Sequence, residues 1–167
     1  EESAMSDVRA VSTREDAIDA LNKGEGFKFD PNLTSIDLKS RYFDYESDQG
    51  SQLVASALQA ENKVDTIVLS SNWIKPSGMT LLAEAFSGHP VVSLDLWNNA
   101  LEDEGMETLA NAFSGSKTLS KLNVATNQIG PQGIVAFAEK LLAGNSSLTW
   151  LRLSSNKAGT QGALAIA

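Results

Sequence analysis

Five stretches of the chain follow one pattern without a gap: LTSIDLKSR (33–41), VDTIVLSSN (64–72), VVSLDLWNN (91–99), LSKLNVATN (119–127) and LTWLRLSSN (148–156). Their last residues are spaced by 31, 27, 28 and 29 positions, and a glycine lies six residues after each of the last four. A fixed period between about 20 and 50 residues is typical of a repeat architecture. The chain of 167 residues is therefore expected to stack similar units that share a core with their neighbours.

Each unit divides into two halves with different hydrophobic periods. In the first half, apolar residues such as Ile67 and Leu69 alternate with polar residues, which is the period of a half-buried strand. After the glycine, the apolar residues take helical spacing, with Met79, Leu82 and Phe86 as one example. The spacing predicts helices over residues 76–87, 103–114 and 131–143.

The pattern L-x-x-L-x-L-x-x-N resembles the leucine-rich repeat, and the helical half with its G-x-x-x-L-A-x-A-F ending resembles the ribonuclease-inhibitor-like subtype. The resemblance implies an α/β fold, a right-handed leucine-rich-repeat solenoid (horseshoe) with parallel inner strands and outer helices. It also implies that asparagines such as Asn72 and Asn99 bond the backbone of neighbouring turns. Arg41 replaces this asparagine in the first unit, which we therefore expect to be a modified capping repeat.

The repeat pattern also sets the expected domain organisation. We assign residues 33–167 to five leucine-rich repeats, the last incomplete, since the fifth unit stops at Ala167 where its predecessors continue. Ahead of the array, Ser12 and Glu15 match a capping box, which predicts a helix ending at Gly24. Residues 11–32 are thus an N-terminal capping helix and linker, and residues 1–10 are expected to form a disordered tail.

Composition excludes several classes of function. The sequence has no cysteine, which excludes disulfides, thiolate zinc sites and thiol nucleophiles. The only histidine, His89, has no nucleophile or carboxylate placed beside it by the repeat, so we predict no catalytic residue, no metal site and no cofactor. A net charge of −8 argues against nucleic acid and anionic membranes, and no stretch approaches the ~20 apolar residues of a membrane span.

Residues 41–50 form an insertion in the first unit. Its acidic residues at alternate positions resemble the first ligands of a calcium loop, but Gln49 stands where that loop requires glycine. We therefore interpret the insertion as a surface loop, and its aromatic residues Tyr42 and Tyr45 indicate contact with a partner.

The strand positions between the buried leucines are expected to face the concave side of the solenoid. All three tryptophans of the chain fall at these positions or beside the repeat asparagine. Trp and Arg are the residue types most enriched at interface hot spots, although packing against neighbouring strand residues is an alternative role for these tryptophans. The predicted partner-binding residues are Trp73, Trp97, Trp150, Arg152, Asp95, Tyr42 and Tyr45.

These observations predict a protein–protein interaction module, not an enzyme, which binds a neutral or basic protein partner on its concave strand surface. The alternative is a regulator of a small GTPase or an inhibitor of another enzyme. The resemblance implies a cytoplasmic protein, and it extends to bacterial effectors that imitate such repeats. An effector acting on host proteins would work in the host cytoplasm.

Overall fold

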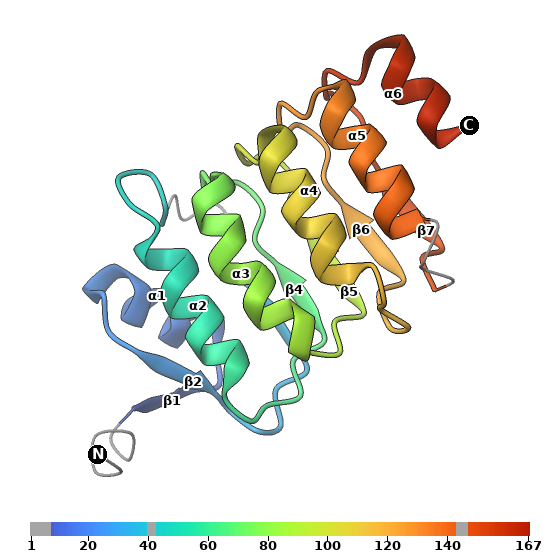
Figure 1. Cartoon of the computed structure of the whole chain (residues 1–167). Coiled ribbons are helices and arrows are strands. Elements are labelled where there is room, and N and C mark those ends of the chain that lie inside the picture. The colour runs from blue at the N-terminus through green and yellow to red at the C-terminus, as the bar shows by residue number, and fades with distance from the viewer. Residues whose placement is uncertain (1–7, 40–42, 143–146) are drawn as a thin grey trace.

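Strands and helices alternate along the chain and build a sheet with a layer of helices on one side (Figure 1). The computed structural model describes residues 8–39, 43–142 and 147–167. Five parallel strands form the main sheet in sequence order, as the repeat predicts. They are β3 (Ser35–Asp37), β4 (Thr66–Val68), β5 (Ser93–Asp95), β6 (Lys121–Asn123) and β7 (Trp150–Arg152).

The helices that follow these strands lie side by side in the same order (Figure 1). They are α2 (Gln49–Gln59), α3 (Pro76–Gly88), α4 (Glu102–Phe113), α5 (Pro131–Phe137) and α6 (Gly159–Ile166). The three predicted helices are confirmed to within one residue, except that α5 continues as a π-helical segment, η2 (Ala138–Leu142). Across the described ranges, no helix has the length and apolar character needed to span a bilayer.

One register runs through the whole sheet and separates its two faces. The central residues of the five strands pair across the sheet, and those of β3 to β6 are buried toward the helices. The residues before and after each central residue form the open face of the sheet, on the side away from the helices. These ten residues are Ser35, Asp37, Thr66, Val68, Ser93, Asp95, Lys121, Asn123, Trp150 and Arg152.

The core lies between the sheet and the helices and is shared by neighbouring units. The rings of Phe86 and Phe113, from α3 and α4, stack with centroids 5.6 Å apart. The repeat glycine allows close packing, since a Cβ at Gly133 would lie 2.8 Å from the Cα of Asp103. The Asp103 Oδ1 atom accepts hydrogen bonds from the amides of Gly130 (2.6 Å) and Gly133 (2.8 Å), so α4 caps the start of α5.

The repeat asparagine ties consecutive units together through buried hydrogen bonds. Asn99 Nδ2 donates to the carbonyl oxygens of Leu69 and Leu96, each at 3.0 Å. Its Oδ1 atom accepts from the amides of Asn72 and Ile74, each at 3.0 Å. The asparagines of the neighbouring units also bond backbone groups of their own and the preceding unit. The role implied by the resemblance is therefore present.

The N-terminal segment folds over the first unit of the array. It contains β1 (Arg9–Val11), α1 (Arg14–Lys23) and β2 (Phe27–Phe29), with β1 and β2 paired in parallel. A helix lies where the sequence predicts one, but its N-cap is Thr13 rather than Ser12, because the Thr13 hydroxyl accepts a hydrogen bond from the Asp16 amide at 3.1 Å. The helix ends at Gly24, whose φ of 67° is left-handed.

The disordered tail predicted for residues 1–10 extends too far along the chain. Arg9 and Ala10 belong to β1, where pairing with β2 and ion pairs from Arg9 to Asp16 and Asp19 hold the backbone. Residues 1–7 lie outside the described part of the chain.

Arg14 covers the first edge of the main sheet. Its guanidinium donates to the carbonyl oxygens of Asp37 (2.9 Å) and Lys39 (3.3 Å), at the end of β3. A side chain that occupies these carbonyls hinders another strand from pairing there. Through Arg14, the N-terminal helix therefore covers part of this edge.

Candidate interaction surface

The open face places several predicted residues beside each other. The register aligns Asp95 of β5, Asn123 of β6 and Arg152 of β7 in one row across the sheet. The next row aligns Lys121 of β6 with Trp150 of β7. Trp150 is 48% exposed, and Arg152 and Lys121 are exposed as well. The sequence placed Trp150, Arg152 and Asp95 on this face, and the structure does so too.

A shallow hollow of about 360 Å³ lies in the middle of the open face. Trp150 and Val68 supply apolar surface, while Lys121 and Asp95 supply opposite charges at its border. The Asp95 carboxylate is held in place, since its Oδ1 atom accepts from Asn123 Nδ2 at 3.0 Å and from the Trp97 amide at 2.9 Å. The hollow therefore combines apolar and charged contacts within one small area.

Trp97 is less available than the sequence analysis assumed. It follows β5 and is only partly exposed. The Lys39 ammonium lies 5.3 Å from the centroid of its ring, a cation–π contact that spans two units of the array. Lys39 and Trp97 occupy the same position in the first and third units, so the contact reaches over the second unit between them.

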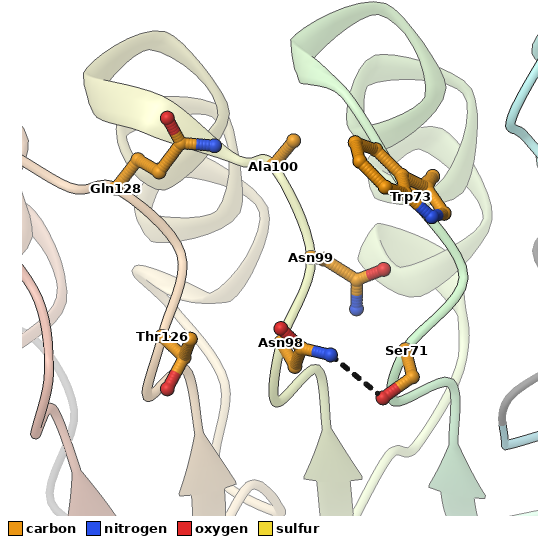
Figure 2. A pocket seen from close by; sticks show the side chains of 7 residues that line it. All are labelled: Ser71, Trp73, Asn98, Asn99, Ala100, Thr126 and Gln128. Carbon is orange, nitrogen blue, oxygen red and sulfur yellow. Dashed lines mark hydrogen bonds between the residues drawn. The ribbon is translucent and has the colours of Figure 1, made fainter.

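A second surface lies along the loops that follow the strands (Figure 2). Figure 2 shows Ser71, Asn98 and Thr126 near the strand ends and Trp73, Ala100 and Gln128 farther along the same loops. We call these six residues, together with Tyr45, the loop edge. The Asn98 amide donates to the Ser71 hydroxyl at 3.0 Å, beside a hollow of about 280 Å³. Trp73 thus lies on the loop edge, beyond the end of β4, and not on the sheet itself.

Trp73 has an unusual backbone conformation. Its φ is 63°, in the left-handed region that bulky side chains rarely adopt. Gln128, two units later, has a φ of 60° at the equivalent position, whereas Ala100 between them is not left-handed. An L side chain in this region costs roughly 1–2 kcal/mol. The chain therefore keeps a large, 44% exposed aromatic residue where glycine or asparagine would be favoured.

The loop predicted to contact a partner lies against Trp73. The Tyr45 and Trp73 rings meet edge to face, with centroids 5.5 Å apart and planes at 80°. The Lys75 ammonium donates to the Tyr45 carbonyl at 3.3 Å, which joins this loop to the next unit. Tyr45 is 61% exposed. The other predicted residue of the loop, Tyr42, lies outside the described residues.

Asp44 fixes the same loop to the interior of the protein. Its side chain is fully buried, and it accepts hydrogen bonds from the Ser51 amide, at 3.0 Å, and from the Ser51 hydroxyl. Burial raises the pKa of Asp44 to about 6, although both hydrogen bonds act in the opposite direction. The carboxylate is thus engaged with helix α2 inside the protein.

His89 lies between α3 and β5, at the end of the strands opposite to the loop edge. Its Nε2 atom contacts the carbonyl oxygen of Val64, a backbone group of the preceding unit. Within the described ranges, no cluster of three or more His, Cys, Asp or Glu side chains is placed to hold a metal ion. The strand side presents aromatic rings, amides, hydroxyls and separated charges.

Comparison with known proteins agrees with this architecture. A family model described as "Leucine Rich repeat" matches residues 89–110, 115–138 and 144–167, which fall on the last three units. The fold is a leucine-rich-repeat solenoid. A search of curated proteins found no match to the sequence.

Two solved structures resemble the leucine-rich-repeat chain over nearly its whole length. One is described as "Leiomodin-1 Actin-Binding Site 2 (ABS2)", with a TM-score of 0.71 and 18% identity, covering 93% of this chain and 86% of that one. The other is the tropomodulin C-terminal domain of Caenorhabditis elegans, with a TM-score of 0.70 and 16% identity, covering 93% and 89%. At these identities the likeness concerns the fold alone.

Two residues that shape these surfaces were not among the predicted partner-binding residues. Lys121 was not selected, although it alternates with the buried Leu122 and its position in the repeat is the same as that of Trp150. Gln128 was likewise not selected, and its position after the repeat asparagine is the same as that of Trp73. Both stand at positions that the repeat pattern places toward the concave side, but the selection relied on Trp and Arg as typical hot-spot residues.

Proposed function

We propose that this chain is a protein-interaction module that binds a protein partner with its strand side, meaning the open face of the sheet together with the loop edge. One observation carries this proposal: the distribution of large apolar side chains that remain exposed. Of the four large apolar side chains that are exposed among the described residues, Tyr45, Trp73 and Trp150 lie on the strand side, and the fourth, Leu164, lies on the last helix, α6. The large apolar residues of α3 and α4 are mostly buried. Aromatic residues of this kind are typical interface anchors.

The shape of the strand side favours a macromolecule over a small ligand. Its hollows are shallow and spread over several units, whereas small-molecule sites enclose most of their ligand. A protein partner covers about 800 Å² on each side, enough to span several strands. The left-handed backbone of Trp73 recurs at Gln128 and at other loop residues of the array, so the exposed ring of Trp73, and not its backbone, favours a binding role.

The repeat geometry supports assignment to the ribonuclease-inhibitor-like subtype, in which strands alternate with full helices. Among defined proteins, actin is the first partner to test, because the description of the leiomodin-1 structure names an actin-binding site. Sedimentation of the chain with purified actin filaments tests that partner directly. Regulation of a small GTPase remains the alternative, and a change in GTP hydrolysis on addition of the chain would support it.

Affinity capture with matched variants tests the binding surface before the partner is known. Trp73→Ala/Trp150→Ala alters the strand side, while Glu84→Ala/Asn111→Ala alters exposed residues of α3 and α4. We expect the wild type and the helix-side variant to retain the same proteins from a eukaryotic lysate, and the strand-side variant to lose them. Retention of the same proteins by all three forms would contradict the proposal.

A further inference from the structure

The open face of the sheet is polarised in charge. Its acidic residues, Asp37 and Asp95, lie on β3 and β5. Its basic residues, Lys121 and Arg152, lie on β6 and β7, and Lys157 follows β7 on the same unit. The open face therefore changes from acidic to basic along the array.

The cations at the basic end are not neutralised within the protein. Lys121, Arg152 and Lys157 are all exposed, and among the described residues no carboxylate lies within 4.0 Å of them. The one hydrogen bond of the Arg152 guanidinium to a described side chain is from Nε to the Ser154 hydroxyl, at 3.3 Å. By contrast, Lys140 on the helix side is paired with a glutamate. Three cations without a paired carboxylate among the described residues, on two neighbouring units, are notable in a chain whose net charge is −8.

Apolar surface adjoins these cations. Trp150 is paired in register with Lys121 and lies two residues before Arg152 on the same face of β7. The neighbouring hollow is lined by the side chains of Trp150 and Val68 and by two opposite charges, Lys121 and Asp95. The Asp95 carboxylate is already engaged by Asn123 and by the Trp97 amide. A ligand group that fits this end must therefore combine an apolar side chain with negative charge.

We infer that the β6–β7 end of the open face binds an acidic segment of the protein partner. This inference rests on the proposed function and adds the chemistry of the bound segment. An aromatic or aliphatic side chain of the segment packs against Trp150, and flanking carboxylates meet Lys121 and Arg152. At the other end of the same face, Asp37 is already paired with Arg14, at 4.0 Å, so Asp95 is the carboxylate that receives basic or neutral residues of the partner. The net charge alone suggested a neutral or basic partner, whereas the local charges specify an acidic contact at this end.

A peptide selection with charge-matched variants tests the inference. A library of random short peptides displayed on phage is selected on the wild type, on Lys121→Glu/Arg152→Glu and on Lys28→Glu/Lys63→Glu. The Lys28/Lys63 variant has the same net charge as the Lys121/Arg152 variant, but its two substituted residues are exposed at positions away from the open face. Circular dichroism checks that all three proteins are folded.

We expect the wild type and the Lys28/Lys63 control to select peptides in which Asp or Glu flanks an apolar residue. The Lys121/Arg152 variant should select peptides with Lys or Arg instead. The best acidic peptide should bind that variant about tenfold more weakly than the wild type, since two exposed ion pairs are replaced by repulsion. Its affinity for the wild type should also fall as salt is added.

Other outcomes overturn the inference in distinguishable ways. If the selected peptides need Trp73 and Trp150 but show no acidic preference, the inference is wrong and the proposed function stands. If they bind every variant equally, including Trp73→Ala/Trp150→Ala, they do not use the strand side, and both statements are contradicted. If the wild type enriches no peptide, the inference is also wrong.

Discussion

Replacement of Asn99 by alanine tests how the array is held together. The Asn99 side chain is buried and makes four hydrogen bonds to backbone groups of its own and the preceding unit, each at 3.0 Å. Alanine would leave two amides and two carbonyls without these partners. Because each such bond contributes about 1 kcal/mol net, we expect a loss of about 4 kcal/mol in the free energy of unfolding. That loss is a large fraction of the free energy of unfolding of a typical domain, which is ~5–15 kcal/mol.

Asn156 provides a matched control within the same protein. It also makes four hydrogen bonds to backbone groups, at 2.9–3.1 Å, but it is only partly buried in the last unit. Water can replace some of its bonds, so Asn156→Ala should cost about half as much as Asn99→Ala.

Urea unfolding measures both costs. Tryptophan fluorescence and circular dichroism are followed together, because repeat arrays can unfold in more than one step. Coincident transitions allow the free energies to be compared. A cost below about 1 kcal/mol for Asn99→Ala, or an equal cost at Asn156, would refute the reasoning that buried asparagines join the units.

Three further substitutions test other parts of the account. Burial holds the pKa of Asp44 at about 6, above the ordinary value of 3.8, so its ionisation costs stability as pH rises between these values. Above pH 6, Asp44→Asn should therefore be more stable than the wild type by up to about 3 kcal/mol in the free energy of unfolding. The difference should vanish below pH 4, and a gain that does not depend on pH would contradict this reasoning. Trp73→Gly relieves the strain of a left-handed backbone but loses the contact with the Tyr45 ring, so the free energy of unfolding should change by less than about 1 kcal/mol. Partner binding should weaken about thirtyfold. Gln128→Gly makes the same backbone change on the loop edge without removing an aromatic ring, so it should weaken binding much less than Trp73→Gly. Equal losses in a titration calorimeter would argue against a special role for Trp73. Asp103→Ala removes the acceptor of two amides at the start of α5 and should cost about 1–2 kcal/mol in thermal unfolding, whereas an unchanged Tm would show that the cap is unimportant.

Much of the fold could be predicted because each unit repeats the same hydrophobic spacing. Leu94 and Leu122 take the same place in the sheet, so a pattern found in one unit fixes the next. The N-terminal segment has no such repetition, which is why β1 was missed. Arg9 and Ala10 are ordered by pairing with β2 and by ion pairs to α1, and neither contact leaves a local signal in the sequence.

The candidate surface could be predicted only in part. Alternation along a strand placed Trp150 and Arg152 on the open face, since neighbouring residues point to opposite sides. It could not show that Lys39 reaches over one unit to cover the ring of Trp97. Nor could it show that the loop turns Trp73 into a left-handed conformation beside Tyr45. These features depend on how separate units are stacked, which composition and spacing do not specify.

The three tryptophans allow the central claim, that a partner binds the strand side, to be measured directly. All three lie on or next to this side, so a chain labelled with 5-fluorotryptophan carries its fluorine probes only there. Fluorine NMR of this chain can be recorded while an unlabelled captured partner is added, with Trp→Phe variants assigning each signal. We predict that the signals of Trp73 and Trp150 shift or broaden as the complex forms, and that saturation coincides with binding measured independently. A saturated complex in which all three fluorine signals stay unchanged would contradict the account.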